Sequence, residues 1–270
     1  MKLQIFQVDA FTNERFGGNP AAVVPLDAWI ADDTMLSIAA ENNLAETAFF
    51  VKSGDRYDIR WFTPKTEVNL CGHATLATAH VIFDELKLEV GFINFHSHRS
   101  GQLGVAKHDR ELILDFPAYP MSEVAPIAGF ESANAEKFFE SQDNMLFVQM
   151  ATEHDIVSFE PDFAMIKALP YEEVIITAKG ETCDFASRMF APRLGIDEDP
   201  VTGAIHCSLI PYWANELNRS TGLYAKQLSA RGGELFCDLA GGRVNIGGNA
   251  VLFMKGEICV DVAYERSASS

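Results

Sequence analysis

Two segments of this 270-residue chain repeat the same order of features. "RWFTP" (Arg60–Pro64) precedes "CGHATLATAHVIF", and "RMFAP" (Arg188–Pro192) precedes "DPVTGAIHCSLIPYWAN". Each copy predicts a strand, an Arg-x-Phe-x-Pro turn, an acidic loop and a helix opened by glycine. The repeat therefore predicts a chain built from two similar lobes.

Both predicted helices lack charged side chains, although 22% of the chain is charged. No charge occurs from Leu70 to Phe83 or from Pro200 to Asn215. A surface helix carries a polar stripe, so a helix without one is expected to be buried on all sides. We expect each lobe to wrap its strands around its own central helix. We also expect Pro211 to kink or end the second helix.

The rest of the chain is rich in short apolar runs that predict strands. The segment 119–134, with two prolines, is the predicted connection between the lobes. We expect an N-terminal lobe over residues 1–117, with the C-terminal segment as a candidate to complete it, and a C-terminal lobe over residues 118–270. Helices are predicted over residues 33–43, 72–84, 133–140, 163–168 and 202–215.

The overall charge and the cysteines limit the partners of the chain. Its net charge of −17 repels phosphate backbones and anionic lipids, so neither nucleic acid nor a membrane is an expected partner. No apolar run reaches 18 residues, and the N-terminus alternates like a strand. The five cysteines are scattered without a CxxC pair. This pattern favours reduced thiols in the cytoplasm over disulfides or structural zinc.

The starts of the two uncharged helices are candidate binding sites. The first N–H groups of a helix lack partners within the helix and carry partial positive charge. If the starts at Gly72 and Gly203 face one cleft, they could hold the carboxylate of an anionic substrate. In the alternative interpretation, side chains such as Asn69, Thr75 or Asp199 cap these groups and nothing else binds there.

His73 and Cys71 lie at the first of these helix starts. The helix N-terminus disfavours imidazolium, so His73 is expected to be neutral, either as a substrate contact or as a satisfied core histidine. The nearest histidine, His80, is seven residues away and no HExxH motif occurs, so we expect no metal. Cys71 could act as a base or nucleophile, but buried free cysteines are usually inert, and we favour the inert interpretation.

A third candidate is Glu46 in "ENNLAETAFF", at the start of a predicted strand. Pressed against Phe49 and Phe50, its carboxylate would lose water and become suited to giving and taking protons. Glu41 is the competing carboxylate, but it ends a polar helix face where we expect it to be solvated. The alternative is that Glu46 is simply exposed. Neither GxGxxG nor GxxxxGK[ST] occurs, so a nucleotide fold gains no support.

Four motifs in order resemble the PhzF family of phenazine-biosynthesis-like proteins, over essentially the whole chain. They are "VDAFTNERFGGNPAAVV", "NNLAETAFF", "RWFTP…CGHATLATAH" and "DEDPVTGAIHCSLIPYW". The resemblance implies the α+β diaminopimelate-epimerase-like fold. In that fold two pseudo-symmetric lobes, each a mostly antiparallel sheet rolled around a central buried helix, hold the active site between them. It also implies a homodimer.

The resemblance implies roles for individual residues. Glu46 matches the general acid/base, which in the phenazine enzyme moves a proton within dihydro-hydroxyanthranilate without a cofactor. His73 and Asp199 match residues that hold and polarise the substrate. Further residues match substrate contacts in the cleft, namely Asn19, Gly72, Gly203 and the position of Ala204.

Two departures separate this chain from the phenazine enzyme. That enzyme has a serine where this chain has Ala204, and Ala45 occupies a position that is commonly serine in the family. Both changes remove a hydroxyl near the site, so the phenazine substrate does not transfer to this chain. The leading interpretation is a cofactor-independent isomerase that moves a proton on a small carboxylate. The alternatives are a two-thiol amino-acid racemase or epimerase using Cys71, disfavoured because Cys207 lies a turn into its helix, and a non-catalytic binding protein.

Overall fold

The computed structural model describes residues 1–130, 133–141 and 144–261, which form two compact units. The first unit contains Met1–Phe16, Pro20–Leu114 and the chain from Gly248 onward. The second contains Gly17–Asn19 and Asp115–Gly247. Strand β8 (Glu111–Pro117) includes the point where the chain leaves the first unit. No helix in the described ranges is long and apolar enough to cross a membrane.

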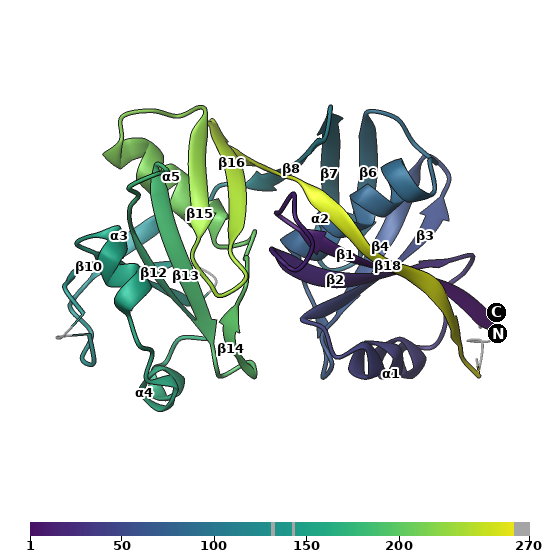
Figure 1. The fold of residues 1–270 in the computed structure, drawn as a ribbon, viewed down its shortest axis with the longest axis horizontal. Coiled ribbons are helices and arrows are strands. Elements are labelled where there is room, and N and C mark those ends of the chain that lie inside the picture. The colour runs from purple at the N-terminus through teal and green to yellow at the C-terminus, as the bar shows by residue number, and fades with distance from the viewer. Residues whose placement is uncertain (131–132, 142–143, 262–270) are drawn as a thin grey trace. The chain divides into compact units, whose positions relative to one another are not determined.

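The first unit is a mixed arrangement of strands with two helices and a short π-helix (Figure 1). β1 and β18 are antiparallel, and β2 and β3 are parallel. β4 is antiparallel to β3 and β5 and parallel to β6, which is antiparallel to β7. The strands are β1 (Lys2–Ala10), β2 (Asn19–Leu26), β3 (Glu46–Ser53), β4 (Arg56–Phe62), β5 (Glu67–Val68), β6 (Phe92–Ser97), β7 (Gly101–His108) and β18 (Ala250–Cys259). The helical segments are α1 (Asp32–Asn42), α2 (Gly72–His80) and the short π-helix η1 (Val81–Glu85).

The second unit shows the same order of strand pairs. β11 and β12 are parallel, β13 is antiparallel to β12 and β14 and parallel to β15, and β15 is antiparallel to β16. Its strands are β9 (Met121–Val124), β10 (Ala135–Ser141), β11 (Met145–Met150), β12 (Glu173–Lys179), β13 (Phe185–Ala191), β14 (Ile196–Asp199), β15 (Leu223–Gln227), β16 (Gly233–Ala240) and β17 (Arg243–Gly248). Its helices are α3 (Glu153–Ser158), α4 (Phe163–Ala168) and α5 (His206–Glu216).

Helix α2 is the buried helix that the missing charges predict. Every residue from Gly72 to Ala79 is buried, and the helix packs against β1, β3 and β18. The hydroxyls of Thr75 and Thr78 donate to helix carbonyl oxygens 2.5 and 2.7 Å away, which satisfies both polar groups inside the core. A Cβ atom at Gly248 would lie 2.3 Å from the Phe11 ring, so only glycine allows this close packing.

Helix α5 departs from the sequence prediction at its start. The regular helix begins at His206, and Gly203–Ile205 form a turn with i→i+3 hydrogen bonds, such as His206 N–H to the Gly203 carbonyl at 3.1 Å. Gly203 therefore precedes the α-helix by a turn. Pro211 does not end α5, which continues to Glu216. Trp213 fixes the helix on the strands, because its Nε1–H donates to the Thr177 hydroxyl on β12 at 3.0 Å.

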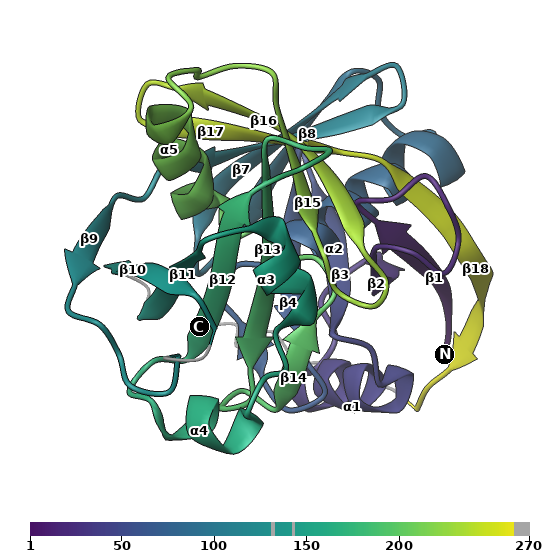
Figure 2. The same cartoon turned by 60° about the vertical axis from the view of Figure 1, so that its left-hand side comes forward.

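One predicted helix is wrong. The segment 133–140 forms strand β10, because it pairs with β9 and β11 and buries Phe138 and Phe139, so tertiary contacts override its local helix preference. The predicted connection over 119–134 includes β9. The sequence did not predict helix α3. Thr152 caps this helix, which packs on β12 and β13 (Figure 2).

The repeated Arg-x-Phe-x-Pro motif has the same local structure in both units. Arg60 donates from Nε and Nη2 to the two carboxylate oxygens of Glu67, at 2.8 and 2.9 Å. Arg188 does the same to Glu198, at 2.7 and 3.0 Å. Each pair joins the long strand that carries the arginine to the short strand that carries the glutamate. The pairs thus anchor β5 and β14, which lead into the two candidate site segments.

Candidate active site

Glu46 is the first residue of β3, and the local sequence fixes it there. Helix α1 ends at Asn42, and Asn43 adopts the left-handed conformation, with φ 49°, that asparagine tolerates well. The Asn42 side chain then donates to the Thr47 hydroxyl at 3.0 Å. β3 pairs in parallel with β2, with Glu46 opposite Ala21. The Glu46 side chain keeps 13% of its surface exposed.

The start of α2 is a candidate binding site. Its N-cap residue, Cys71, makes no side-chain cap hydrogen bond to the helix. The side chains proposed as caps are used elsewhere, because the Asn69 amide oxygen accepts from Arg99 at 3.3 Å and the Thr75 hydroxyl donates to the Cys71 carbonyl oxygen. Gly72 and His73 occupy the first turn. This arrangement favours the interpretation of the helix start as a site over that of a capped terminus.

His73 joins two other reactive groups in the first unit. Its Nε2 lies 3.2 Å from Glu46 Oε2, and its Nδ1 lies 3.5 Å from Cys71 Sγ. Burial lowers the pKa of His73 to about 3, so the imidazole is neutral at pH 7. The tautomer with its proton on Nε2 places a donor beside the carboxylate and an acceptor beside the thiol. Sequence analysis set Cys71 aside, although the Cys-x-His spacing at a helix start was a signal for this contact.

Asp199 is the centre of a second polar group, in the second unit. Its carboxylate is buried and accepts from Asn19 Nδ2 at 2.9 Å and from the Thr202 hydroxyl. Burial raises the pKa of Asp199 to about 6, against the lowering effect of the hydrogen bonds from Thr202 and Asn19. An acid with this pKa changes protonation near neutral pH, which makes it a candidate functional group.

Asn19 is the first residue of β2, but together with Gly17 and Gly18 it belongs to the second unit, which contains Asp199. The Arg231 guanidinium donates to the carbonyl oxygens of Gly18 and Gly17, at 2.7 and 2.8 Å. Asn19 itself is fully buried and also donates to the Val201 carbonyl oxygen at 2.9 Å. The resemblance predicted Asn19 as a cleft residue, and the structure brings it to Asp199.

Two residues that sequence analysis missed hold the Asp199 segment in place. Gln227, fully buried on β15, donates to the Asp199 carbonyl oxygen at 2.9 Å and accepts from Thr202 N–H at 2.8 Å. Thr202 lies inside the "DPVTG" motif and was open to detection, whereas nothing local distinguishes Gln227. The turn that follows places Gly203 in the interior and Ala204 half-buried.

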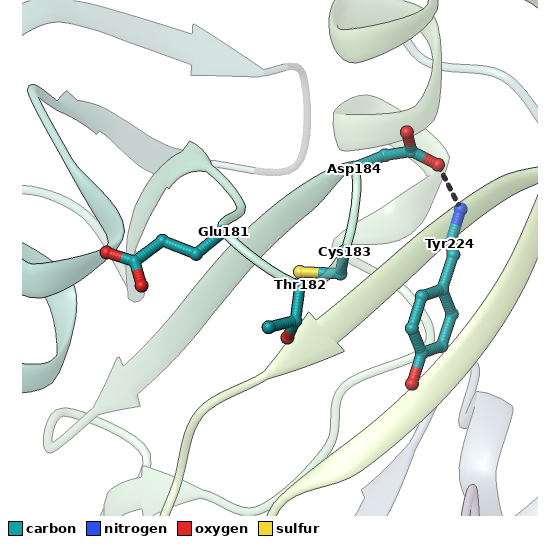
Figure 3. Close-up of a pocket in the computed structure, with 5 residues that line it drawn as sticks. All are labelled: Glu181, Thr182, Cys183, Asp184 and Tyr224. Atoms are coloured by element: carbon teal, nitrogen blue, oxygen red, sulfur yellow. Dashed lines mark hydrogen bonds between the residues drawn. The ribbon is translucent and has the colours of Figure 1, made fainter.

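A surface pocket in the second unit is lined by none of the predicted site residues. It has a volume of about 320 Å³ and is lined by Glu181, Thr182, Cys183, Asp184 and Tyr224 (Figure 3). Asp184 accepts from the backbone N–H of Tyr224 at 2.7 Å and also pairs with Arg219. Burial raises the pKa of Cys183 to about 11, so its thiol stays protonated and unreactive.

Comparison with known proteins identifies the family. The family model of phenazine biosynthesis-like proteins (PhzC-PhzF) matches residues 8–256. The chain belongs to this family. Two proteins of Pseudomonas aeruginosa, both described as uncharacterized isomerases, are 52% and 48% identical to this PhzF-family chain. Each alignment covers 96% of this chain and 99% of the relative. The expectation of an isomerase is therefore confirmed at the level of enzyme class.

Solved structures agree with the family and the fold. A PhzF-family protein from Enterococcus faecalis has a TM-score of 0.92 and 45% sequence identity, over 96% of this chain and 100% of that chain. A hydroxyproline epimerase from Agrobacterium vitis, at 10% identity, has a TM-score of 0.64 over 98% of this chain and 93% of that chain. At that identity the likeness concerns the fold alone. The expected epimerase-like fold is confirmed.

Proposed function

We propose that this PhzF-family isomerase moves a proton on a small carboxylate substrate, with Glu46 as general acid and base and without a cofactor. The observation that carries the proposal is the position of the Glu46 carboxylate, 3.2 Å from a buried, neutral imidazole and still partly exposed. A general base must be reachable by its substrate, and the partial exposure of Glu46 and its contact with His73 support this role.

The neutral state of His73 supports a division of labour. With a pKa of about 3, the imidazole does not retain a proton at neutral pH. A proton taken from a substrate carbon therefore stays on Glu46, which can return it to a second carbon. His73 then acts as a hydrogen-bond donor that orients the carboxylate, and in the bound state it polarises the substrate.

We further propose that the Asp199 group serves the same reaction. Asp199 and Asn19 would orient the substrate, while backbone N–H groups near Gly72, Gly203 and Ala204 would bind its carboxylate. The matching strand pairs and arginine–glutamate pairs support two lobes related by pseudo-symmetry. A homodimer is proposed from the family resemblance, and sedimentation velocity tests it. The scattered cysteines of the sequence, which include no CxxC pair, support the cytoplasm as the location.

Solvent isotope exchange tests the proposed chemistry. The EDTA-treated protein is incubated in D2O with a panel of carboxylates bearing an acidic C–H, and NMR follows the loss of proton signals. The proposal expects at least one member to be isomerised with deuterium incorporated from solvent. Turnover that requires an added cofactor, or that carries no solvent label, would contradict it.

A racemase that uses Cys71 is the second candidate, favoured by the 3.5 Å contact between its Sγ and the imidazole. Such enzymes need a second thiol, and Cys207 is fully buried within α5. Activity that survives complete alkylation of Cys71 by iodoacetamide would exclude this candidate. Tight ligand binding without turnover would instead favour a non-catalytic binding protein.

A further inference from the structure

We propose that Glu46, Cys71 and His73 form a binding site for zinc or a similar divalent transition-metal ion, and that the bound ion inhibits the enzyme. One ligand atom from each of these residues lies within 4.8 Å of the other two. The effect on activity rests on the proposed function of Glu46, whereas the binding itself does not. The sequence alone offers only His80 as a second ligand beside His73, because Glu46 lies far from both in sequence.

The ligand types fit zinc. Thiolate, imidazole and carboxylate are its usual protein ligands, and three of them leave one tetrahedral position open. With bonds of about 2.3 Å to sulfur and about 2.0 Å to nitrogen, a tetrahedral ion separates these two atoms by roughly 3.5 Å. Cys71 Sγ and His73 Nδ1 are already 3.5 Å apart. The separation of these two ligand atoms therefore already matches that of a tetrahedral site.

Glu46 must move to complete the site. Its carboxylate now contacts Nε2, and a metal ion takes only one ring nitrogen. The side chain can turn toward the ion because it is the most exposed of the three, and the distance that it must cover is short. Binding the ion and orienting Glu46 on the imidazole are therefore mutually exclusive.

Charge and protons balance when the ion binds. The imidazole of His73 contributes a nitrogen lone pair to the ion. The Cys71 thiol loses its proton to the solvent, so each ion bound releases one proton. A divalent ion with one thiolate, one carboxylate and one imidazole has no net charge, which suits a largely buried site. Magnesium should not bind, because it prefers oxygen ligands in octahedral geometry.

Cobalt(II) is the probe for this site, because it replaces zinc and reports its ligands by absorption. The full chain is titrated with Co²⁺ under reducing conditions. A thiolate-to-cobalt charge-transfer band is expected at one equivalent, and zinc should abolish it. The band should persist in Cys259→Ser, which removes an exposed thiol, and disappear in Cys71→Ser. No band, or a band that survives in Cys71→Ser, would overturn the proposal.

Two further variants test the other ligands. Glu46→Gln and His73→Asn should each weaken cobalt binding on the order of tenfold or more, since even the loss of outer-sphere partners costs that much. Circular dichroism and thermal melting identify any variant that fails to fold. If every folded ligand variant bound cobalt as the wild type does, the assignment of this site would be wrong.

Inhibition is measured with the substrate found by isotope exchange. Zinc should slow turnover by the wild type, and EDTA should restore the rate. Cys71→Ser should lose a much smaller fraction of its own zinc-free rate. A cobalt band without zinc inhibition would overturn the inhibitory part. A failure of the proposed function gives a different result. In that case Glu46→Gln would keep its isomerase activity, and the wild type would still show the cobalt band.

Discussion

Asp199 shows how one buried acid links stability to function. Its pKa of about 6 in the folded protein exceeds the ordinary value of 3.8, so the folded state binds this proton more tightly than the unfolded state does. Stability therefore falls as pH rises from about 4 to about 6, and above that range the ionised group costs on the order of 3 kcal/mol. A buried charge that lowers stability at neutral pH is typical of a functional position.

Replacing Asp199 by asparagine should separate these two effects. Asp199→Asn removes the buried charge, so its free energy of unfolding at pH 8 should exceed that of the wild type by about 1–3 kcal/mol, and the difference should vanish near pH 4. Activity should fall. Urea denaturation from pH 4 to pH 8 measures the difference, with the exposed neighbour Asp197→Asn as control. An unchanged pH dependence in Asp199→Asn would refute the buried ionised state.

At this scale, the candidate site residues come from local motifs, and their roles stay predictions. Glu46, His73 and Asp199 lie in short motifs, and the structure gives each of them a defined polar partner. Gln227 was not predictable, because its partners lie about 25 residues away and a buried glutamine on a strand has no sequence signature. The sequence did not predict the contact between Cys71 and His73, because burial favoured an inert thiol.

At the scale of secondary-structure elements, the two arginine–glutamate pairs join neighbouring strands: Arg60–Glu67 joins β4 to β5, and Arg188–Glu198 joins β13 to β14. Arg188 also donates to the carbonyl oxygens of Ile156 and Phe159, at 3.1 and 2.8 Å, so it joins α3 to β13 and β14. Its side chain is 12% exposed and that of Glu198 is 22% exposed. Removing one member of such a pair leaves the other charge and two carbonyls without their partner.

Arg188→Met should therefore destabilise the protein by on the order of 3 kcal/mol. Arg188→Lys should lose less, because it keeps the charge but not the two-point geometry. Guanidinium or urea denaturation measures both. The exposed Arg110→Met should stay within about 0.5 kcal/mol of the wild type, and an equally small effect at Arg188 would show that the pair contributes little.

Predicted elements agree with the structure in some segments and not in others. The helix Phe163–Ala168 has the predicted bounds, whereas residues 133–140 form a strand. That segment has helix-forming residues, and only its neighbours β9 and β11 decide its structure. The start of α5 was placed a turn early because the glycine signal does not distinguish an α-helix from a tighter turn.

At the scale of the whole molecule, the net charge of −17 opposes folding through repulsion. Raising the sodium chloride concentration from about 10 mM to about 150 mM shortens the screening length from about 30 Å to about 8 Å. The free energy of unfolding at pH 7.5 should rise by roughly 1 kcal/mol as this repulsion is screened. Urea denaturation at the two concentrations checks the effect, and a fall in stability with salt would show that attractive pairs dominate.

The repeat is the feature through which the sequence predicted most of the architecture. Two uncharged segments predicted two buried helices, and the structure contains both, each following an arginine-anchored short strand. Which strands pair in parallel was not predictable, because parallel pairing depends on contacts between distant segments. The proposed chemistry depends on fewer residues, and above all on Glu46.

The rate of C–H to C–D exchange in D2O tests that central claim most directly. It is measured by NMR on an accepted substrate for the wild type, Glu46→Gln and the exposed Glu41→Gln. Glu46→Gln should exchange roughly 10²–10⁴-fold more slowly, because the amide cannot take the proton, and Glu41→Gln should match the wild type. Exchange by folded Glu46→Gln at the wild-type rate would contradict the assignment of Glu46 as the proton carrier.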